Sequence, residues 1–393
     1  MGKRARLASA AATLLLLGQV VTAAPAAASP GVTTVTADQP SAVPAGRLWS
    51  FNDFFPRTVT VRTGSDLQFI NEGFHTFTVL PAGDTAKADA HANAITLDDT
   101  DDAGLNPNGT THSELNLPAV FPTSFTCGPV PAPACDFDGS SVVSSGAPLA
   151  GPPAPFMVHV TASPGTYVFI CRIHAGMTGK LKVLPAVATV PSAAQVDKQI
   201  AKQIKNDLHG AAVADAQANR DAVKQNKDGT RTLHVTAGTS SHDGKVALLE
   251  FFPRVLDAKP GDTVVFKPKS PNEPHTVTFP GDLGTEMVNL CETASGDIPF
   301  GPPDFSCPDH PGQGPDEVEW DGGNGVWNLT VPGAAGTISD SGIVAARRWT
   351  SDIGASSTDA LTSWTVSLAG AAPGTYTYVC QIHDGMEASI VVH

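Results

Sequence analysis

Apolar and polar positions alternate over short stretches of this chain, and the stretches end at turns that contain glycine or proline. Val59, Val61, Leu67 and Phe69 recur at every second position on either side of a glycine turn, and a comparable pattern runs over 255–266. A period of two is typical of half-buried β-strands. The chain also holds 37 Gly and 33 Pro, which supply many turns. The pattern therefore predicts an all-β protein with long irregular loops.

The pattern occurs twice along the chain. The sequence Phe-Phe-Pro-Arg at 54–57 returns at 251–254, and a Pro-Gly-Thr-Tyr segment at 164–177 returns at 373–386. A short strand is expected after each of the latter segments, over 180–183 and 389–392. A duplication of this kind predicts two tandem Greek-key β-sandwiches.

The two copies are separated by a segment with a different composition, 186–232, which is rich in Ala, Gln, Lys and Asp. Ser192 and Gln195 have the spacing of a helix capping box. Apolar residues then recur every fourth position, at Val196, Ile200, Ile204 and Leu208. We expect a helical linker with a break at Gly210. Its apolar stripe is too narrow for an independent domain, so it should pack on one sandwich or on both.

The N-terminus has the pattern of an export signal. Basic residues come first, at Lys3, Arg4 and Arg6, followed by an apolar run and by small residues that end at Ala28. No second apolar run is long enough to span a membrane. We therefore expect a protein exported to an oxidising compartment, without membrane insertion. The predicted organisation is a signal peptide over 1–28, a first sandwich over 29–185, a helical linker over 186–232 and a second sandwich over 233–393.

Charge narrows the range of partners. The formal net charge is −14, and only 16% of the 393 residues are charged. An acidic surface repels phosphate backbones and anionic lipid headgroups. Nucleic acid is therefore not an expected partner.

Six cysteines divide into three per copy. Each copy has a long insertion, over 81–155 and 281–363, and each insertion has one cysteine pair: Cys127 with Cys135, and Cys291 with Cys307. In an exported protein we expect both pairs to form disulfides. The two cysteines left over, Cys171 and Cys380, each come at the end of a predicted strand.

These two cysteines begin a repeated metal-binding pattern. Each is followed by His after three positions and by Met after six: Cys171, His174 and Met177, then Cys380, His383 and Met386. His75 and His275 occupy equivalent positions about one hundred residues upstream. A thiolate, two imidazoles and a weak axial thioether form the ligand set of a type 1 copper site. A lone buried Cys or Met is usually a core residue, but two copies with matching upstream histidines favour metal binding.

Both copies resemble the cupredoxins of the plastocyanin/azurin type, on the motif G-T-Y-x-F/Y-x-C-x-I-H-x-G-M and the upstream His-Thr. The resemblance implies one type 1 copper per sandwich, held by His75, Cys171, His174 and axial Met177, and by His275, Cys380, His383 and axial Met386. It also implies that the second histidine of each set lies near the surface, where redox partners dock. The family commonly has Asn after the first histidine. Here Thr76 and Thr276 follow it, so a bond between the ligand loops would need a hydroxyl.

Copper enzymes built from repeated cupredoxin domains use additional histidines, including His-x-His pairs and a His beside the type 1 Cys. This chain has no His-x-His, and its cysteines are flanked by Ile170 and Arg172, and by Val379 and Gln381. We therefore expect one-electron transfer without an enzymatic site, with a redox protein or a small electron donor or acceptor as partner. The alternatives are an extracytoplasmic copper carrier or buffer and, third, a copper oxidase with an unrecognised site in the insertions. The sequence leaves the oligomeric state open.

Overall fold

The computed structural model describes residues 32–84, 95–98, 112–116, 127–146, 154–174, 176–220, 223–227, 229–281, 289–290, 297–301, 326–328, 339–341, 344–347 and 362–393. The predicted signal peptide over 1–28 and the predicted Cys291–Cys307 disulfide lie outside these residues. The described part of the chain consists of β-strands with one long helix, as the sequence predicts.

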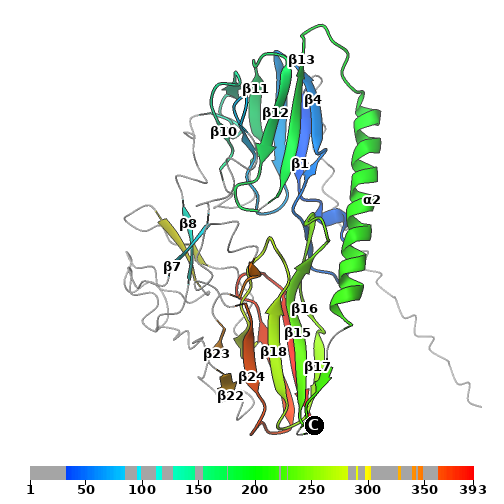
Figure 1. Ribbon diagram of the computed structural model, residues 1–393. Coiled ribbons are helices and arrows are strands. Elements are labelled where there is room, and N and C mark those ends of the chain that lie inside the picture. The colour runs from blue at the N-terminus through cyan, green and yellow to red at the C-terminus, as the bar shows by residue number, and fades with distance from the viewer. Residues whose placement is uncertain are drawn as a thin grey trace, which may run out of the picture.

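The first half is a sandwich of two five-stranded sheets (Figure 1). One sheet contains, in order, β3 (Phe54–Phe55), β1 (Val32–Ala37), β5 (Ser65–Asn71), β11 (Phe156–Val160) and β9 (Cys135–Phe137). The other contains β10 (Val143–Ser144), β6 (Thr78–Val79), β12 (Gly165–Ile170), β13 (Thr178–Leu184) and β4 (Thr58–Arg62). Alternate side chains of both sheets point inward. Aromatic rings fill the space between them, with Phe54 and Phe169 4.9 Å apart between ring centroids.

The second half repeats this arrangement. One sheet contains β2 (Trp49–Phe51), β16 (Val246–Phe252), β15 (Arg231–Ser240), β18 (Thr263–Pro268), β24 (Trp364–Ser367) and β22 (Val326–Asn328), and β14 (Val223–Gln225) also pairs with β15. The other contains β17 (Val255–Ala258), β26 (Glu387–Val392), β25 (Gly374–Val379), β19 (Thr278–Phe279) and β23 (Ser339–Asp340). Here Tyr378 lies at the centre of the core, 4.8 Å from Phe251 between ring centroids. The two-sandwich prediction is confirmed.

One strand crosses between the halves. β2 comes from the first copy, after a 3-10 turn (Pro40–Ala42), yet it pairs antiparallel with β16 of the second. Trp49 lies opposite Leu248, and Phe51 lies opposite Val246. These side chains join Phe55 in a third apolar cluster, separate from the two sandwich cores. The two halves are therefore joined by a shared sheet as well as by the linker.

The helix α2 (Ala193–Ala218) is the predicted linker, and it runs beside both sandwiches (Figure 1). It begins after Ser192, whose backbone N–H donates to the Gln195 side chain at 2.8 Å. The predicted break at Gly210 is wrong, because the helix continues through that position. A Cβ built at Gly210 would lie 3.2 Å from Cβ of Ser241. The glycine thus allows the helix to approach the second sandwich closely.

Buried ion pairs hold α2 against both halves. Arg57 contacts Asp53 at 2.5 Å and Asp207 of the helix at 2.6 Å. Nearer the C-terminus of the helix, Arg47 contacts Asp215 at 2.9 Å and Glu250 at 3.4 Å. Each of these four carboxylates has an arginine partner, which offsets the cost of its desolvation.

The two insertions meet each other. Strands β7 (Ile95–Asp98) and β8 (His112–Asn116) come from the first insertion, and β20 (Asn289–Leu290) and β21 (Asp297–Gly301) from the second. They form one four-stranded sheet in which β8 pairs with β21. The predicted disulfide between Cys127 and Cys135 is confirmed, with the Cα atoms 4.9 Å apart.

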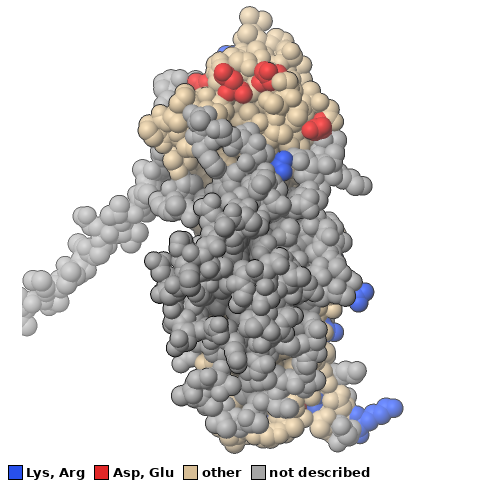
Figure 2. Space-filling view, turned by 90° about the vertical axis from the view of Figure 1, so that its left-hand side faces the viewer, with Lys and Arg blue, Asp and Glu red and all other residues tan. Residues whose placement is uncertain are grey.

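Figure 2 shows the side of the molecule that lies at the left of Figure 1. Acidic side chains gather at the top of this view, over the first sandwich. Lysine and arginine side chains lie mainly along one edge of the lower part. Within the described residues, no helix has the length and apolar character needed to cross a membrane.

Candidate metal centres

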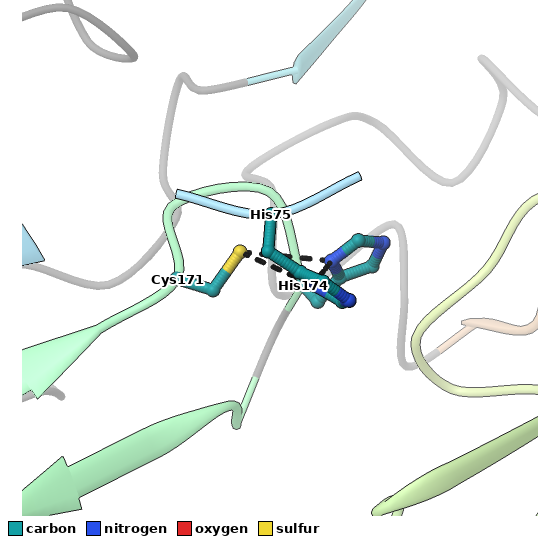
Figure 3. A group of neighbouring side chains, drawn as sticks. All are labelled: His75, Cys171 and His174. Atoms are coloured by element: carbon teal, nitrogen blue, oxygen red, sulfur yellow. Dashed lines mark hydrogen bonds between the residues drawn. The ribbon is translucent and has the colours of Figure 1, made fainter. Parts of the chain in front are cut away.

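Three side chains of the first sandwich converge at one end of its core. Cys171 follows β12 directly, His174 comes one turn later, and His75 lies between β5 and β6. The Cys171 Sγ is 3.6 Å from Nδ1 of His174 and 3.9 Å from Nδ1 of His75. The two Nδ1 atoms are 3.0 Å apart. Figure 3 shows the sulfur and both rings pointing toward one another.

The second sandwich has the same cluster. The Cys380 Sγ is 3.5 Å from Nδ1 of His383 and 4.0 Å from Nδ1 of His275. In both clusters the three donor atoms lie within 4.8 Å of one another. The sequence repeat thus produces two groups with the same donor atoms in nearly the same arrangement.

A short hydrogen-bonded loop fixes each cysteine relative to its methionine. The backbone N–H of Cys171 donates to the carbonyl of Met177 at 3.0 Å, and the Met177 N–H donates to the carbonyl of His174 at 3.1 Å. The same two bonds, 2.9 Å and 3.1 Å long, close the loop from Cys380 to Met386. Both methionines are fully buried and belong to the same apolar cores as the cysteines.

Threonine ties the upstream histidine segment to the cysteine loop. The hydroxyl of Thr76 accepts the backbone N–H of Arg172 at 2.7 Å, and the hydroxyl of Thr276 accepts that of Gln381 at 2.8 Å. The backbone N–H of each threonine also points at the cysteine sulfur, at 3.4 Å. The hydroxyl bond that the sequence required in place of asparagine is therefore present in both halves.

The charges of the clusters are coupled. Burial raises the pKa of both cysteine thiols, but hydrogen bonds and attraction from the two histidines outweigh it and bring each thiol pKa well below its usual value. Burial by itself lowers the pKa of His275. Each cluster therefore favours a thiolate, which is the form that binds metals.

Glu273 lies between the two clusters, and the sequence analysis missed it. Its Oε1 is 3.3 Å from Nε2 of His174, and its Oε2 is 3.6 Å from Nε2 of His383. Asn52, from the first half, donates to Oε1 at 2.8 Å. The only sequence signal is position, since Glu273 precedes the ligand histidine His275 by two residues.

The same contact corrects the expected place of the two downstream histidines. His174 is 7% exposed, the His383 side chain is 12% exposed, and both face Glu273 rather than an open docking patch. Burial opposes the charged form of each ring, but attraction by Glu273 and bonds to the cysteines outweigh it and raise each histidine pKa to about 9. Burial likewise opposes ionisation of Glu273, but the two histidines lower its pKa to about 2. Glu273 is therefore ionised, and it attracts both histidines.

The donor chemistry fits copper. Each cluster offers one thiolate sulfur and two imidazole nitrogens, with a buried thioether at the end of the same loop. That combination suits both common oxidation states of copper and is typical of blue-copper sites.

No family model matches the chain, and neither does any curated protein sequence. Two β-sheets face each other in each half, and the Cys–His–Met loop follows the strand that leads to it. Each half is an all-β sandwich of two facing sheets, as expected from the sequence.

Solved structures similar to the chain include reduced auracyanin from Roseiflexus castenholzii, with 18% identity over 39% of this chain and 98% of that one, and a TM-score of 0.22. A mutant fern plastocyanin has 18% identity over 39% of this chain and all of its own, and a TM-score of 0.19. A copper-containing nitrite reductase from Thermus scotoductus has 13% identity over 92% of this chain and 67% of that one, and a TM-score of 0.19.

One sequence prediction is corrected here. The chain was expected not to be an enzyme, on the absence of His-x-His pairs. The structures that match over most of its length include the nitrite reductase and a blue copper oxidase from Nitrosomonas europaea, both named as enzymes; the oxidase has 11% identity over 92% of this chain and 85% of that one, and a TM-score of 0.17. A non-enzymatic role therefore does not follow from the missing motif.

Proposed function

We propose that the chain is an exported protein that holds one copper ion in each cluster and passes electrons one at a time. The proposed ligands are His75, Cys171, His174 and Met177 in the first half, and His275, Cys380, His383 and Met386 in the second. The observation that carries the proposal is the pair of buried Cys–His–His clusters, each closed by a loop that ends in a buried methionine.

Bound copper would supply a centre that alternates between Cu(I) and Cu(II). The protein's own contribution is to hold the donor atoms still. The N–H groups of Thr76 and Thr276 donate to the cysteine sulfurs, and the threonine hydroxyls fix the cysteine loops. Because these groups are buried and already bonded, water is kept from the donor atoms and little has to move when the charge at the site changes.

Export and the partner are part of the same proposal. The basic and apolar N-terminal pattern supports secretion or delivery to a periplasmic or cell-wall space. The disulfide between Cys127 and Cys135 supports an oxidising compartment. The partner would be a redox protein or a small electron donor or acceptor, and the net charge of −14 favours a basic one.

The test is the copper content and visible spectrum of the reconstituted mature protein. We expect two copper ions per chain and an intense thiolate-to-copper band. Cys171→Ser and Cys380→Ser should each remove one of the two ions and part of the band. Cys127→Ser/Cys135→Ser, which removes the disulfide only, is the matched control and should keep both. Full copper content and an unchanged band in either single cysteine variant would refute the ligand assignment.

Further measurements separate the other roles. A carrier or buffer would surrender its copper to a competing chelator within a few redox cycles, whereas an electron-transfer protein would retain it. Turnover of oxygen, phenols or nitrite by the loaded protein, or a third copper ion per chain, would instead identify an enzyme. Either result would replace the proposal of simple electron transfer.

A further inference from the structure

We propose that Glu273 couples the two clusters into one electronic unit, and that an electron passes between them through the bridge His174–Glu273–His383. This inference rests on the proposed function, because it concerns two sites that hold copper. It adds a positioning residue, and a route for internal electron transfer, that neither half contains alone.

The two downstream histidines, His174 and His383, have the same orientation relative to their clusters. In each ring Nδ1 faces the cysteine sulfur, at 3.6 Å for His174 and 3.5 Å for His383. The opposite nitrogen, Nε2, faces Glu273 in both cases. A carboxylate that accepts the outer N–H of a ligand histidine fixes its tautomer and its ring plane. Here a single carboxylate stands in that position for two histidines, one from each sandwich.

Hydrogen bonds from both halves hold Glu273 in place. The Ser270 hydroxyl accepts the backbone N–H of Glu273 at 3.2 Å and that of Asn272 at 3.3 Å. The Asn272 side chain donates to the carbonyl of Gly244 at 3.0 Å, and Asn52 donates to Glu273 Oε1 from the first half. The carboxylate is therefore held from both sides of the interface, and it is only 6% exposed. A side chain held in this way is pre-organised rather than drawn in by chance.

The proposed step is simple. Copper bound in both clusters would supply the redox change. One ion would be oxidised from Cu(I) to Cu(II), and the electron that it loses would reduce the other ion from Cu(II) to Cu(I). No bond is formed or broken, and Glu273 remains a carboxylate throughout. The bridge consists of two imidazoles and one carboxylate, with nitrogen–oxygen distances of 3.3 Å and 3.6 Å.

The test is Glu273→Gln, made in the full chain and in the single-site backgrounds Cys171→Ser and Cys380→Ser. A carboxamide keeps an acceptor oxygen at only one of the two positions, so its NH2 group would face the outer N–H of one histidine. We expect Cu(II) affinity, measured by chelator competition, to fall about 10- to 100-fold at each site. We also expect both reduction potentials to rise, because a negative charge beside Cu(II) is lost. Glu250→Gln, which changes a buried acid that contacts Arg47 and Arg254, is the control and should leave both sites unchanged.

Electron exchange is measured separately. After rapid reduction by one electron, the native two-site protein should show a first-order redistribution phase whose rate does not depend on protein concentration. That phase should be slower in Glu273→Gln. An unchanged rate, or a change in affinity and potential at one site only, would overturn the inference. Absence of blue copper in the single-site backgrounds would instead refute the proposed function.

If Glu273→Gln does not fold, Glu273→Asp applies the same test. A carboxylate shorter by one methylene cannot reach both Nε2 atoms, so at least one affinity should fall. Unchanged affinity at both sites would again overturn the inference.

Discussion

The two halves differ at two equivalent positions beside their clusters. At each position one half has an acidic residue and the other has a glycine. The first half has Asp38 and Gly73, whereas the second has Gly238 and Glu273. Asp38 and Gly238 both have a left-handed backbone, with φ of 66°. A Cβ at Gly73 would lie 2.8 Å from Asp38 Oδ2, so the glycine makes room for the acid. Each half thus pairs one acid with one glycine, at opposite positions.

The two acidic residues, Asp38 and Glu273, make different contacts. Asp38 accepts the backbone N–H of Phe51 at 3.0 Å and the Ser50 hydroxyl at 3.1 Å, so it holds the strand that crosses to the second half. Glu273 contacts the outer nitrogens of two ligand histidines. The repeat therefore builds two similar clusters, and the divergence between copies joins them.

The largest effect should come from Gly238→Ala. The left-handed backbone alone costs an alanine about 1–2 kcal/mol, and the new Cβ would lie 1.8 Å from Nε2 of His275. The ring must move, so we expect the second site to lose most of its copper affinity while the first keeps its own. Chelator competition measures both.

The matched control is Gly261→Ala. This glycine also has a left-handed backbone, with φ of 90°, but no atom within 4 Å of the added Cβ. It should lower stability without changing copper binding. Equal copper loss in both variants would show that strain, and not the contact with His275, sets the affinity.

Thr76→Val and Thr276→Val test whether the two loops are held alike. Each change removes the hydroxyl that accepts a loop N–H, from Arg172 or from Gln381. A buried donor left without its acceptor costs about 1–3 kcal/mol, and we expect similar losses in both halves. Urea unfolding of the metal-free protein gives the values, with Thr60→Val on β4 as control. A loss in one half only would show that the loops are not equivalent.

Two acidic positions along α2 provide the next comparison. Burial raises the pKa of Asp207 from 3.8 to about 6, although Arg57 lowers it in part. The folded state then binds more protons than the unfolded state between about pH 4 and pH 6. The contribution of Asp207 to the free energy of unfolding therefore falls as pH rises through this window. Asp207→Asn should remove that slope, whereas Asp215→Asn, nearer the C-terminus of the helix, should retain it. An identical pH dependence in the native and Asp207→Asn proteins would contradict the assignment.

The smallest effect concerns the cores. Tyr378 occupies the position that Phe169 has in the first half, and its hydroxyl is buried with no hydrogen-bond partner among the described residues. Tyr378→Phe should raise stability by about 1 kcal/mol, because an unsatisfied buried hydroxyl is costly. Phe169→Tyr should lower it. Thermal unfolding of the two variants measures both, and a loss of stability in Tyr378→Phe would show that the hydroxyl is used.

Local patterns made much of the fold predictable. The alternation of apolar residues, the repeat and the capping residues at Ser192 and Gln195 act over a few neighbouring positions, and each predicted an element that the structure contains. The convergence of His75 with Cys171 and His174 followed from the repeated motif. The same holds for the Cys127–Cys135 disulfide, where a short separation makes the pairing simple.

The interface between the halves was not predictable in this way. Glu273 meets His174 and His383 only because segments far apart in the chain come together, and no local spacing encodes that contact. The crossing of β2 has the same origin. The helix break predicted at Gly210 was wrong because a glycine within a helix can permit close packing as well as end the helix. The prediction that the chain is not an enzyme was wrong because it relied on the absence of a His-x-His motif and not on the residues of an identified site.

The crossing of β2 also has a consequence for biosynthesis. A chain that emerges from its N-terminus presents Trp49 and Phe51 about two hundred residues before their partners on β16. Until then these side chains have no sheet to cover them, and exposed apolar strands favour aggregation. Strand β2 can therefore pair with its partner strand only after that part of the second half has been synthesised. A nascent chain cut anywhere before residue 246 would expose an apolar edge and would be a target for chaperones and proteases.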